Sequence, residues 1–196
     1  MDCWTLRGVI FDMDGTLTVP VIDFAEMRRR LGIPDGDILA VLRSWPAERR
    51  AAAFAVIEEI EDRARAELRV QPGAPELLAF LDDHGILKGV ITRNTEKTVR
   101  HFEARVGHRF SEVVSRDFEP VKPDPASAVH ICRKWGLPPE QVLMVGDYRY
   151  DILCGRQAGT RTCLLRNEKN GEYEALADFA VDDLHALRQR IAAAIA

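Results

Sequence analysis

Residues 7–18 read RGVIFDMDGTLT, and this stretch decides which fold we expect for the chain. Residues 7–11 predict a strand, because GVIF is apolar without alternation, as in a short strand buried on both faces of a parallel sheet. Ligands of an open parallel sheet bind beyond the carboxyl ends of the strands, so Asp12 and Asp14 are expected at a binding edge. The two aspartates lie two residues apart in extended chain, which points both carboxylates the same way.

Further apolar runs predict strands, and helical patterns separate them. The predicted strands cover residues 87–91, 112–115, 142–145 and 162–165. Predicted helices cover residues 75–84, 95–107, 125–136, 152–159 and a final segment from about 183 to the C-terminus. Asn94 and Asp124 are the expected N-caps of two of them, and glycine follows several of the others. This alternation predicts an α/β fold with a doubly wound parallel sheet, that is, a Rossmann-like core.

One segment, residues 19–70, interrupts the alternation and contains only helical patterns. Helices are predicted over residues 23–31, 37–43 and 47–69, the last with apolar residues three or four positions apart. Gln71-Pro72-Gly73 then returns the chain to the alternating pattern. We therefore expect a Rossmann-like core formed by residues 1–18 and 71–196, with an all-helical insert at 19–70.

The bulk properties are those of an ordinary globular protein. Of 196 residues, 46% are apolar and 30% are charged, and the formal net charge of −4 does not favour nucleic acid or an anionic membrane as partner. No apolar run approaches the roughly 18 residues of a membrane span, and the N-terminus does not resemble a signal peptide. The four cysteines lack metal-binding spacing and indicate a reduced compartment. We expect a cytoplasmic protein, and the oligomeric state stays open.

Candidate phosphate-binding residues lie after one predicted strand and in one later loop. Thr92 ends the strand at residues 87–91, and Arg93 and Asn94 come before the next helix. A hydroxyl and the N–H groups of a helix N-terminus can hold phosphate oxygens, although helix capping explains the same residues. Lys122 lies in the segment PVKPDP, where the flanking prolines restrict the backbone. Its ammonium is expected to neutralise phosphate charge.

Two more carboxylates, Asp147 and Asp151, come after the strand at residues 142–145 in the segment GDYRYD. Together with Asp12 and Asp14 they crowd negative charge at one sheet edge, which requires a proton or a cation. Mg²⁺ prefers such oxygen ligands. The sequence therefore predicts a Mg²⁺ site at this edge, while Asp151 is open to a simpler interpretation as the N-cap of the next helix.

Taken in order, these motifs resemble those of the haloacid dehalogenase-like hydrolase superfamily, in its phosphatase branch, and are similar to those of phosphoglycolate phosphatases. The resemblance rests on DMDGTLT at 12–18, Thr92, Lys122 and GDYRYD at 146–151, and it covers nearly the whole chain. The insert resembles the small helical cap of that superfamily. The resemblance implies a Mg²⁺-dependent hydrolase of a small-molecule phosphate ester.

The resemblance also implies a role for each matching residue. Asp12 is expected to attack phosphorus and form an aspartyl-phosphate, and Asp14 to act as general acid and then general base. Mg²⁺ is expected on the Asp12 carboxylate, the Asp14 backbone carbonyl and Asp147, with Asp151 acting through water. The residues expected to bind phosphate are Thr92, Arg93, Asn94 and Lys122.

Departures from the superfamily pattern define the alternatives. Arg93 stands where the superfamily often has Asn or Ser, and Tyr148 where serine is common. Asp14 argues against a dehalogenase, and the insert contains no lysine for phosphonate cleavage. A sugar phosphomutase tends to carry His and Lys in the insert, and neither is present in residues 19–69. The phosphomutase remains an alternative, as does a non-catalytic scaffold or binding protein of the same fold.

Overall fold

The computed structural model describes residues 5–195, and the chain forms two compact units. The first, called the core unit here, comprises residues 5–19 and 69–195. The second, the helical unit, comprises Pro20–Leu68. An antiparallel bridge between Thr18 and Val70 joins the two chain segments of the core unit just before the helical unit departs and just after it returns.

A parallel sheet forms the centre of the core unit. Within the described residues its six strands have the order β3-β2-β1-β4-β5-β6. The strands are β1 (Gly8–Phe11), β2 (Leu87–Ile91), β3 (Glu112–Val114), β4 (Val142–Gly146), β5 (Arg161–Leu165) and β6 (Phe179–Val181). Phe11 pairs with Val90 on one side and with Val145 on the other, so β1, β2 and β4 end at the same edge. The predicted doubly wound α/β fold is confirmed.

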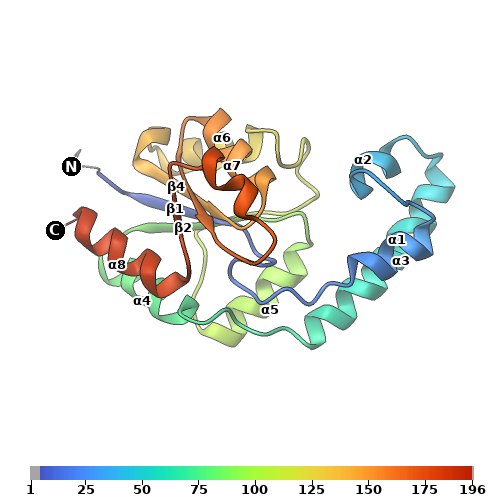
Figure 1. Ribbon diagram of the computed structural model, residues 1–196, viewed down its shortest axis with the longest axis horizontal. Helices are drawn as coiled ribbons and strands as arrows, with labels where there is room; N and C mark the ends of the chain where they lie inside the picture. Colours follow the sequence, from blue (N-terminus) through green and yellow to red (C-terminus); the bar gives the residue numbers. More distant parts are fainter. Residues whose placement is uncertain (1–4, 196) are drawn as a thin grey trace. The chain divides into compact units, whose positions relative to one another are not determined.

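Helices cover both faces of this sheet, as Figure 1 shows, with α6 and α7 on one side and α4, α5 and α8 on the other. Their bounds are α4 (Ala74–Asp83), α5 (Glu96–Val106), α6 (Ala126–Trp135), α7 (Arg149–Ala158) and α8 (Leu184–Ile195). Short 3-10 helices lie at Pro139–Gln141 and Gly171–Leu176. The three central strands are almost wholly buried, which explains their largely apolar sequence, and the one buried charge among them, Lys88 of β2, is paired with Asp82.

The helical unit has a hydrophobic core of its own. It contains α1 (Phe24–Leu31), α2 (Ile38–Arg43) and α3 (Ala47–Ala66), the first two capped by the side chains of Asp23 and Asp37. Trp45 and Phe54 pack against this core. Arg28 donates to the backbone carbonyls of Ile33 and Gly36, and other basic residues of the unit pair with Glu26 and Glu59. Much of its positive charge is therefore engaged within the unit itself.

Helix α6 has Pro125 rather than Asp124 as its N-cap, although Asp124 Oδ1 accepts the Ala126 N–H and so resembles a cap in sequence.

Three other local features also differ from the expectations. Strand β6 was not predicted, because three residues in an acidic segment carry too little pattern. Helix α5 has Thr95 rather than Asn94 as its N-cap, since the Asn94 side chain bonds elsewhere. Helix α7 begins at Arg149, so Asp151 lies in its first turn and is not the N-cap. An acidic residue three positions into a helix can accept a hydrogen bond from the N-cap N–H, and the two positions are easily confused in sequence.

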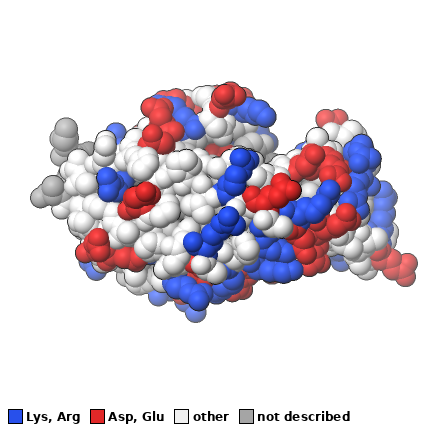
Figure 2. All heavy atoms as spheres, turned by 90° about the horizontal axis from the view of Figure 1, so that it is seen from below, with Lys and Arg blue, Asp and Glu red and all other residues white. Residues whose placement is uncertain are grey.

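The distribution of surface charge does not indicate a particular partner. On the face drawn in Figure 2, basic and acidic side chains are interspersed and do not form one large patch of a single sign. Among residues 5–195, no helix has the length and apolar character needed to cross a membrane.

Cys132, Cys154 and Cys163 are free and buried, as expected of small apolar side chains. Cys3 lies outside the described residues.

The aromatic ring of Trp135 fixes how α6 packs on the sheet. A Cβ at Gly8 would lie 2.6 Å from Trp135 Cζ3, and one at Gly89 would lie 3.0 Å from Trp135 Cζ2. The two glycines stand on adjacent strands, with Gly8 opposite Leu87 and Gly89 opposite Ile10 in the register. Glycine at both positions therefore leaves room for the indole to lie against the strand backbone. The indole Nε1–H donates to Ser111 Oγ.

We predict that Gly8→Ala lowers the free energy of unfolding by about 1–3 kcal/mol, because the added methyl overpacks this contact. Gly171→Ala is the matched control, since a Cβ there meets no atom within 4 Å, and it should change stability by less than about 0.5 kcal/mol. Urea unfolding measures both. Equal stabilities of the two variants would contradict this account of the packing.

Candidate active site

The turn after β1 brings two aspartates to the carboxyl edge of the sheet. Asp12 comes directly after β1, and its N–H donates to the Val145 carbonyl, so the nucleophile expected from sequence is tied to β4. Gly15 has φ +94°, and a Cβ there would collide with the Asp147 carboxylate. The turn is closed by the Gly15 N–H donating to the Thr18 carbonyl. Glycine is thus required both by the backbone conformation and by the approach of Asp147.

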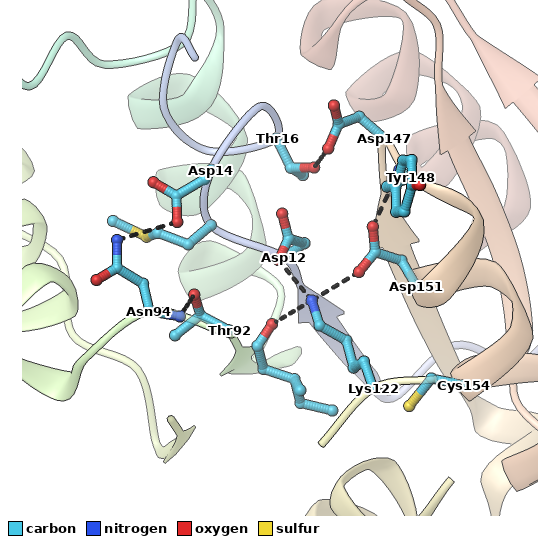
Figure 3. Close-up of polar contacts among 12 residues, drawn as sticks. Asp12, Asp14, Thr16, Thr92, Asn94, Lys122, Asp147, Tyr148, Asp151 and Cys154 are labelled. Atoms are coloured by element: carbon cyan, nitrogen blue, oxygen red, sulfur yellow. Dashed lines mark hydrogen bonds and ion pairs between the residues drawn. The ribbon is translucent and has the colours of Figure 1, made fainter. Parts of the chain in front are cut away.

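Lys122 lies at the centre of the site with its side chain almost fully buried. Its Nζ is 2.5 Å from Asp12 Oδ1 and 2.6 Å from Asp151 Oδ1, and it donates to the Ile91 carbonyl at 2.8 Å. Figure 3 shows the ammonium surrounded by these three acceptors. All three of its donor hydrogens therefore have a partner, which is how a buried ammonium is tolerated.

Asp147 lies at the end of β4 and is held by side chains from two other segments. Thr16 Oγ1 contacts its Oδ1 at 3.4 Å, and Asn167 Nδ2 donates to its Oδ2 at 3.1 Å. Asn170 Nδ2 donates to the Asp147 backbone carbonyl at 2.8 Å and also to the Leu165 carbonyl. Sequence reasoning assigned no role to Thr16, Asn167 or Asn170. The two asparagines come after β5. A polar residue just beyond a predicted strand is the feature of the sequence that could have indicated them as site residues.

The carboxylates of Asp12, Asp147 and Asp151 form a cluster that suits a hard cation. One oxygen from each lies within 4.8 Å of the others. Asp151 Oδ2 accepts the Tyr148 N–H at 3.0 Å, and its Oδ1 accepts from Lys122, so both Asp151 oxygens are already engaged. The donor set of this cluster is the oxygen-only type that Mg²⁺ prefers. Asp147 also accepts at both oxygens, but from the uncharged side chains of Thr16 and Asn167, so its charge is less compensated than that of Asp151, which is paired with Lys122.

Burial and mutual repulsion shift the acid–base properties of the cluster. Burial, followed by the charge of Asp151, raises the pKa of Asp147 from its usual value to about 7. Burial also raises the pKa of Asp12 despite the nearby ammonium, and raises that of Asp14. Burial lowers the pKa of Lys122, but the charges of Asp12 and Asp151 outweigh it and raise the pKa overall. The lysine stays charged, while the carboxylates favour a proton or a cation.

The segment after β2 brings Thr92 and Asn94 to the same edge, and both are buried. Thr92 Oγ1 accepts the Asn94 N–H at 3.0 Å, and Asn94 Nδ2 donates to Asp14 Oδ2 at 3.2 Å. Figure 3 shows Asn94 reaching Asp14 on the side of the site opposite Asp147. The Arg93 guanidinium lies 5.2 Å from the Tyr150 ring centroid and is half-buried, so it does not simply extend into solvent.

All the residues chosen from the sequence therefore come from the carboxyl ends of β1, β2 and β4 or from the loop before α6. They are Asp12, Asp14, Thr92, Arg93, Asn94, Lys122, Asp147 and Asp151. A parallel α/β core with an inserted helical unit carries an aspartate–lysine centre at this edge, which is the arrangement of an α/β protein whose site chemistry depends on carboxylates.

Comparison with known proteins defines the family. The family described as haloacid dehalogenase-like hydrolase matches residues 18–165, a range that begins after Asp12 and Asp14. A haloacid dehalogenase-like hydrolase domain-containing protein of Arabidopsis thaliana is 43% identical over 192 residues, covering 91% of this chain and 77% of the relative. N-acetylmuramic acid 6-phosphate phosphatase of Pseudomonas aeruginosa is 31% identical over 185 residues and covers 82% of each chain.

The fold agrees with this result. The crystal structure of a hydrolase from Pseudomonas syringae superimposes with a TM-score of 0.81 at 23% identity, covering 95% of this chain and 98% of the other. The chain therefore belongs to the haloacid dehalogenase-like hydrolases, and the enzyme family predicted from its motifs is confirmed.

We predict opposite effects of Asp147→Asn with and without metal. In EDTA at pH 8 the variant should be more stable than wild type by about 1 kcal/mol, since a buried, repelled charge is removed. Because folding raises the pKa of Asp147 to about 7, the folded wild type binds the proton first. Wild type should therefore gain stability as pH falls from about 7 towards about 4, and the variant should lack this gain.

Mg²⁺ should reverse the order at pH 8, because an ion that binds only the folded state stabilises wild type more than the variant. Thermal unfolding at pH 5 and 8, in EDTA and in Mg²⁺, measures all four conditions. The interpretation would be wrong if the variant were the less stable protein in EDTA at pH 8, or if both proteins gained equally from Mg²⁺.

Proposed function

We propose that the protein is a Mg²⁺-dependent phosphomonoester hydrolase that passes a phosphoryl group from Asp12 to water. The observation that carries the proposal is the Lys122 ammonium 2.5 Å from Asp12 Oδ1, with Asp147 and Asp151 beside it. This contact fixes one Asp12 oxygen and orients the carboxylate. A positioned carboxylate among fixed charges is what attack on phosphorus requires, because phosphoryl transfer depends mainly on positioning and charge stabilisation.

The positions of the other residues suggest their roles. The Thr92 hydroxyl holds a phosphoryl oxygen, and the Lys122 ammonium, whose hydrogens are donated within the protein, binds the phosphate through its positive charge. Asp14 donates a proton to the leaving oxygen and later takes one from the attacking water. Arg93, held against Tyr150, flanks the phosphate site. Splitting the reaction at an aspartyl-phosphate divides one difficult displacement into two.

The metal is assigned to the cluster of Asp12, Asp147 and Asp151. Asp12 and Asp147 hold it by their carboxylates, and the Asp14 backbone carbonyl contributes as in the superfamily. Asp151 acts through water because its oxygens are held by the Lys122 ammonium and a backbone N–H, whereas those of Asp147 accept from uncharged side chains. With Mg²⁺ bound, the repulsion between these carboxylates and a phosphate dianion is offset. Thr16, Asn167 and Asn170 hold Asp147 in place, as outer-sphere partners of metal ligands commonly do.

A small phosphorylated metabolite is the substrate class we propose, and the helical unit is assigned the part of a cap. The N-acetylmuramic acid 6-phosphate phosphatase relative supports a phosphate monoester. Arg28 and Arg30 bond within the helical unit, so we do not assign them to the substrate. The scaffold alternative is not favoured, since Asp12, Asp147 and Lys122 are intact and converge.

We predict that the purified protein releases phosphate from p-nitrophenyl phosphate with Mg²⁺, and that Asp12→Asn lowers kcat at least about a thousandfold because the nucleophile is gone. Asp83→Asn, an exposed aspartate of α4, is the matched control and should keep full activity. EDTA should abolish turnover and Mg²⁺ restore it, whereas Ca²⁺ should not, since it takes more ligands at longer distances. Undiminished turnover by Asp12→Asn would refute the assigned nucleophile.

A further inference from the structure

We propose that Asn94 is a positioning residue that orients Asp14, so that the proton of Asp14 is carried on Oδ1 and not on Oδ2. The proposal rests on the proposed phosphohydrolase function and assigns Asn94 a role other than binding phosphate. Its starting point is the hydrogen bond from Asn94 Nδ2 to Asp14 Oδ2, 3.2 Å long and 80 positions apart in sequence.

Asn94 is held rigidly enough to orient another side chain. Its backbone N–H donates to Thr92 Oγ1 at 3.0 Å, and its carbonyl accepts the Arg116 N–H at 3.1 Å. Its side-chain Oδ1 accepts the Thr95 N–H at 2.7 Å and the Thr98 hydroxyl at 3.1 Å. The residue is only 4% exposed, so water competes little for these bonds.

These contacts decide which way the amide faces. The Thr95 N–H can only donate, so the atom opposite it must be the Asn94 oxygen. A flipped amide would place two donors against each other at 2.7 Å and would lose the bond to Asp14 as well. The oxygen and nitrogen of an asparagine side chain are assigned from such a network, and here the network allows one assignment. Nδ2 therefore points at Asp14.

The fixed amide determines which Asp14 oxygen handles the proton. Because Nδ2–H can only donate, Asp14 Oδ2 must be an acceptor whether Asp14 is ionised or neutral. In a neutral carboxylic acid the carbonyl oxygen is the stronger acceptor, so the bond from Asn94 to Oδ2 favours the proton on Oδ1. In the first step Oδ1–H gives its proton to the leaving oxygen as the P–O bond breaks, leaving Asp14 ionised. In the second step Oδ1 takes a proton from the water that attacks the aspartyl-phosphate, which regenerates the acid.

A positioning role and a phosphate-binding role predict different kinetics. An acid that protonates the leaving group matters most when the leaving group is poor and little when it is good. A phosphate ligand matters equally for both esters and also for inorganic phosphate. Phenyl phosphate and p-nitrophenyl phosphate form a suitable pair, since both carry one aromatic ring while p-nitrophenolate is the better leaving group.

The test compares variants of Asn94 on these two esters. Asn94→Asp keeps an oxygen for Thr95 and Thr98 but removes the donor, and Asn94→Ala removes both. We expect kcat/KM, which reports the steps up to departure of the leaving group, to fall about 10- to 100-fold for phenyl phosphate in each variant and less than about threefold for p-nitrophenyl phosphate. The inhibition constant of inorganic phosphate should stay within about twofold of wild type, because phosphate binding is untouched.

Two further variants keep the test decisive. Thr92→Ala, at a proposed phosphate ligand, should reduce turnover of both esters similarly and raise the inhibition constant of phosphate. Thr98→Val removes one of the two bonds to Asn94 Oδ1 and should give a smaller loss with the same preference for phenyl phosphate, even if the Asn94 variants fail to fold.

Equal losses on the two esters, or weaker inhibition by phosphate in the Asn94 variants, would overturn the proposal. Failure of the proposed function has a different signature, since wild type itself would then release no phosphate from either ester.

Discussion

The site depends on one buried ammonium shared by two carboxylates. Lys122 Nζ bridges Asp12 and Asp151 at 2.5 and 2.6 Å, and so connects the end of β1 to the first turn of α7. A buried ion pair of this kind costs desolvation that only several good hydrogen bonds repay. The carboxylates at this edge nevertheless outnumber the ammonium, so their repulsion is only partly offset. That excess negative charge is the physical reason why we assign a divalent cation to the site.

The sheet order explains how residues distant in sequence meet here. Strand β1 lies between β2 and β4, so the segments that leave the carboxyl ends of these three strands start at one edge. Lys122 arrives from the loop before α6, and Trp135 of this helix lies against Gly8 in β1 and Gly89 in β2. Helix α6 therefore packs on the glycine backbone of β1 and β2, and the loop that leads into this helix carries Lys122 into the site.

Sequence could predict most of the framework and only part of the site. Strands β1, β2 and β4 were placed to within a residue, because burial on both faces leaves a mostly apolar run, interrupted only by Lys88 in β2. The start of α7 was misplaced, since Asp151 resembles an N-cap but accepts the Tyr148 N–H from inside the helix. The bond from Asn94 to Asp14 could not be read from sequence, because 80 residues separate the partners and only the β1–β2 pairing brings them together. Asn167 and Asn170 follow β5, but their contacts with Asp147 arise only from the pairing of β4 with β5, so sequence reasoning assigned them no specific role.

The central claim, that Asp12 and Asp147 share one divalent cation, is tested most directly by counting bound ions. Mn²⁺ can replace Mg²⁺ in oxygen-ligand sites, and electron paramagnetic resonance distinguishes free from bound Mn²⁺. A titration of the protein should show one bound Mn²⁺ per chain that Mg²⁺ displaces, and the Asp12→Asn/Asp147→Asn double variant should have lost it. A wild-type protein that binds no ion, or a double variant that binds Mn²⁺ as tightly as wild type, would contradict the account.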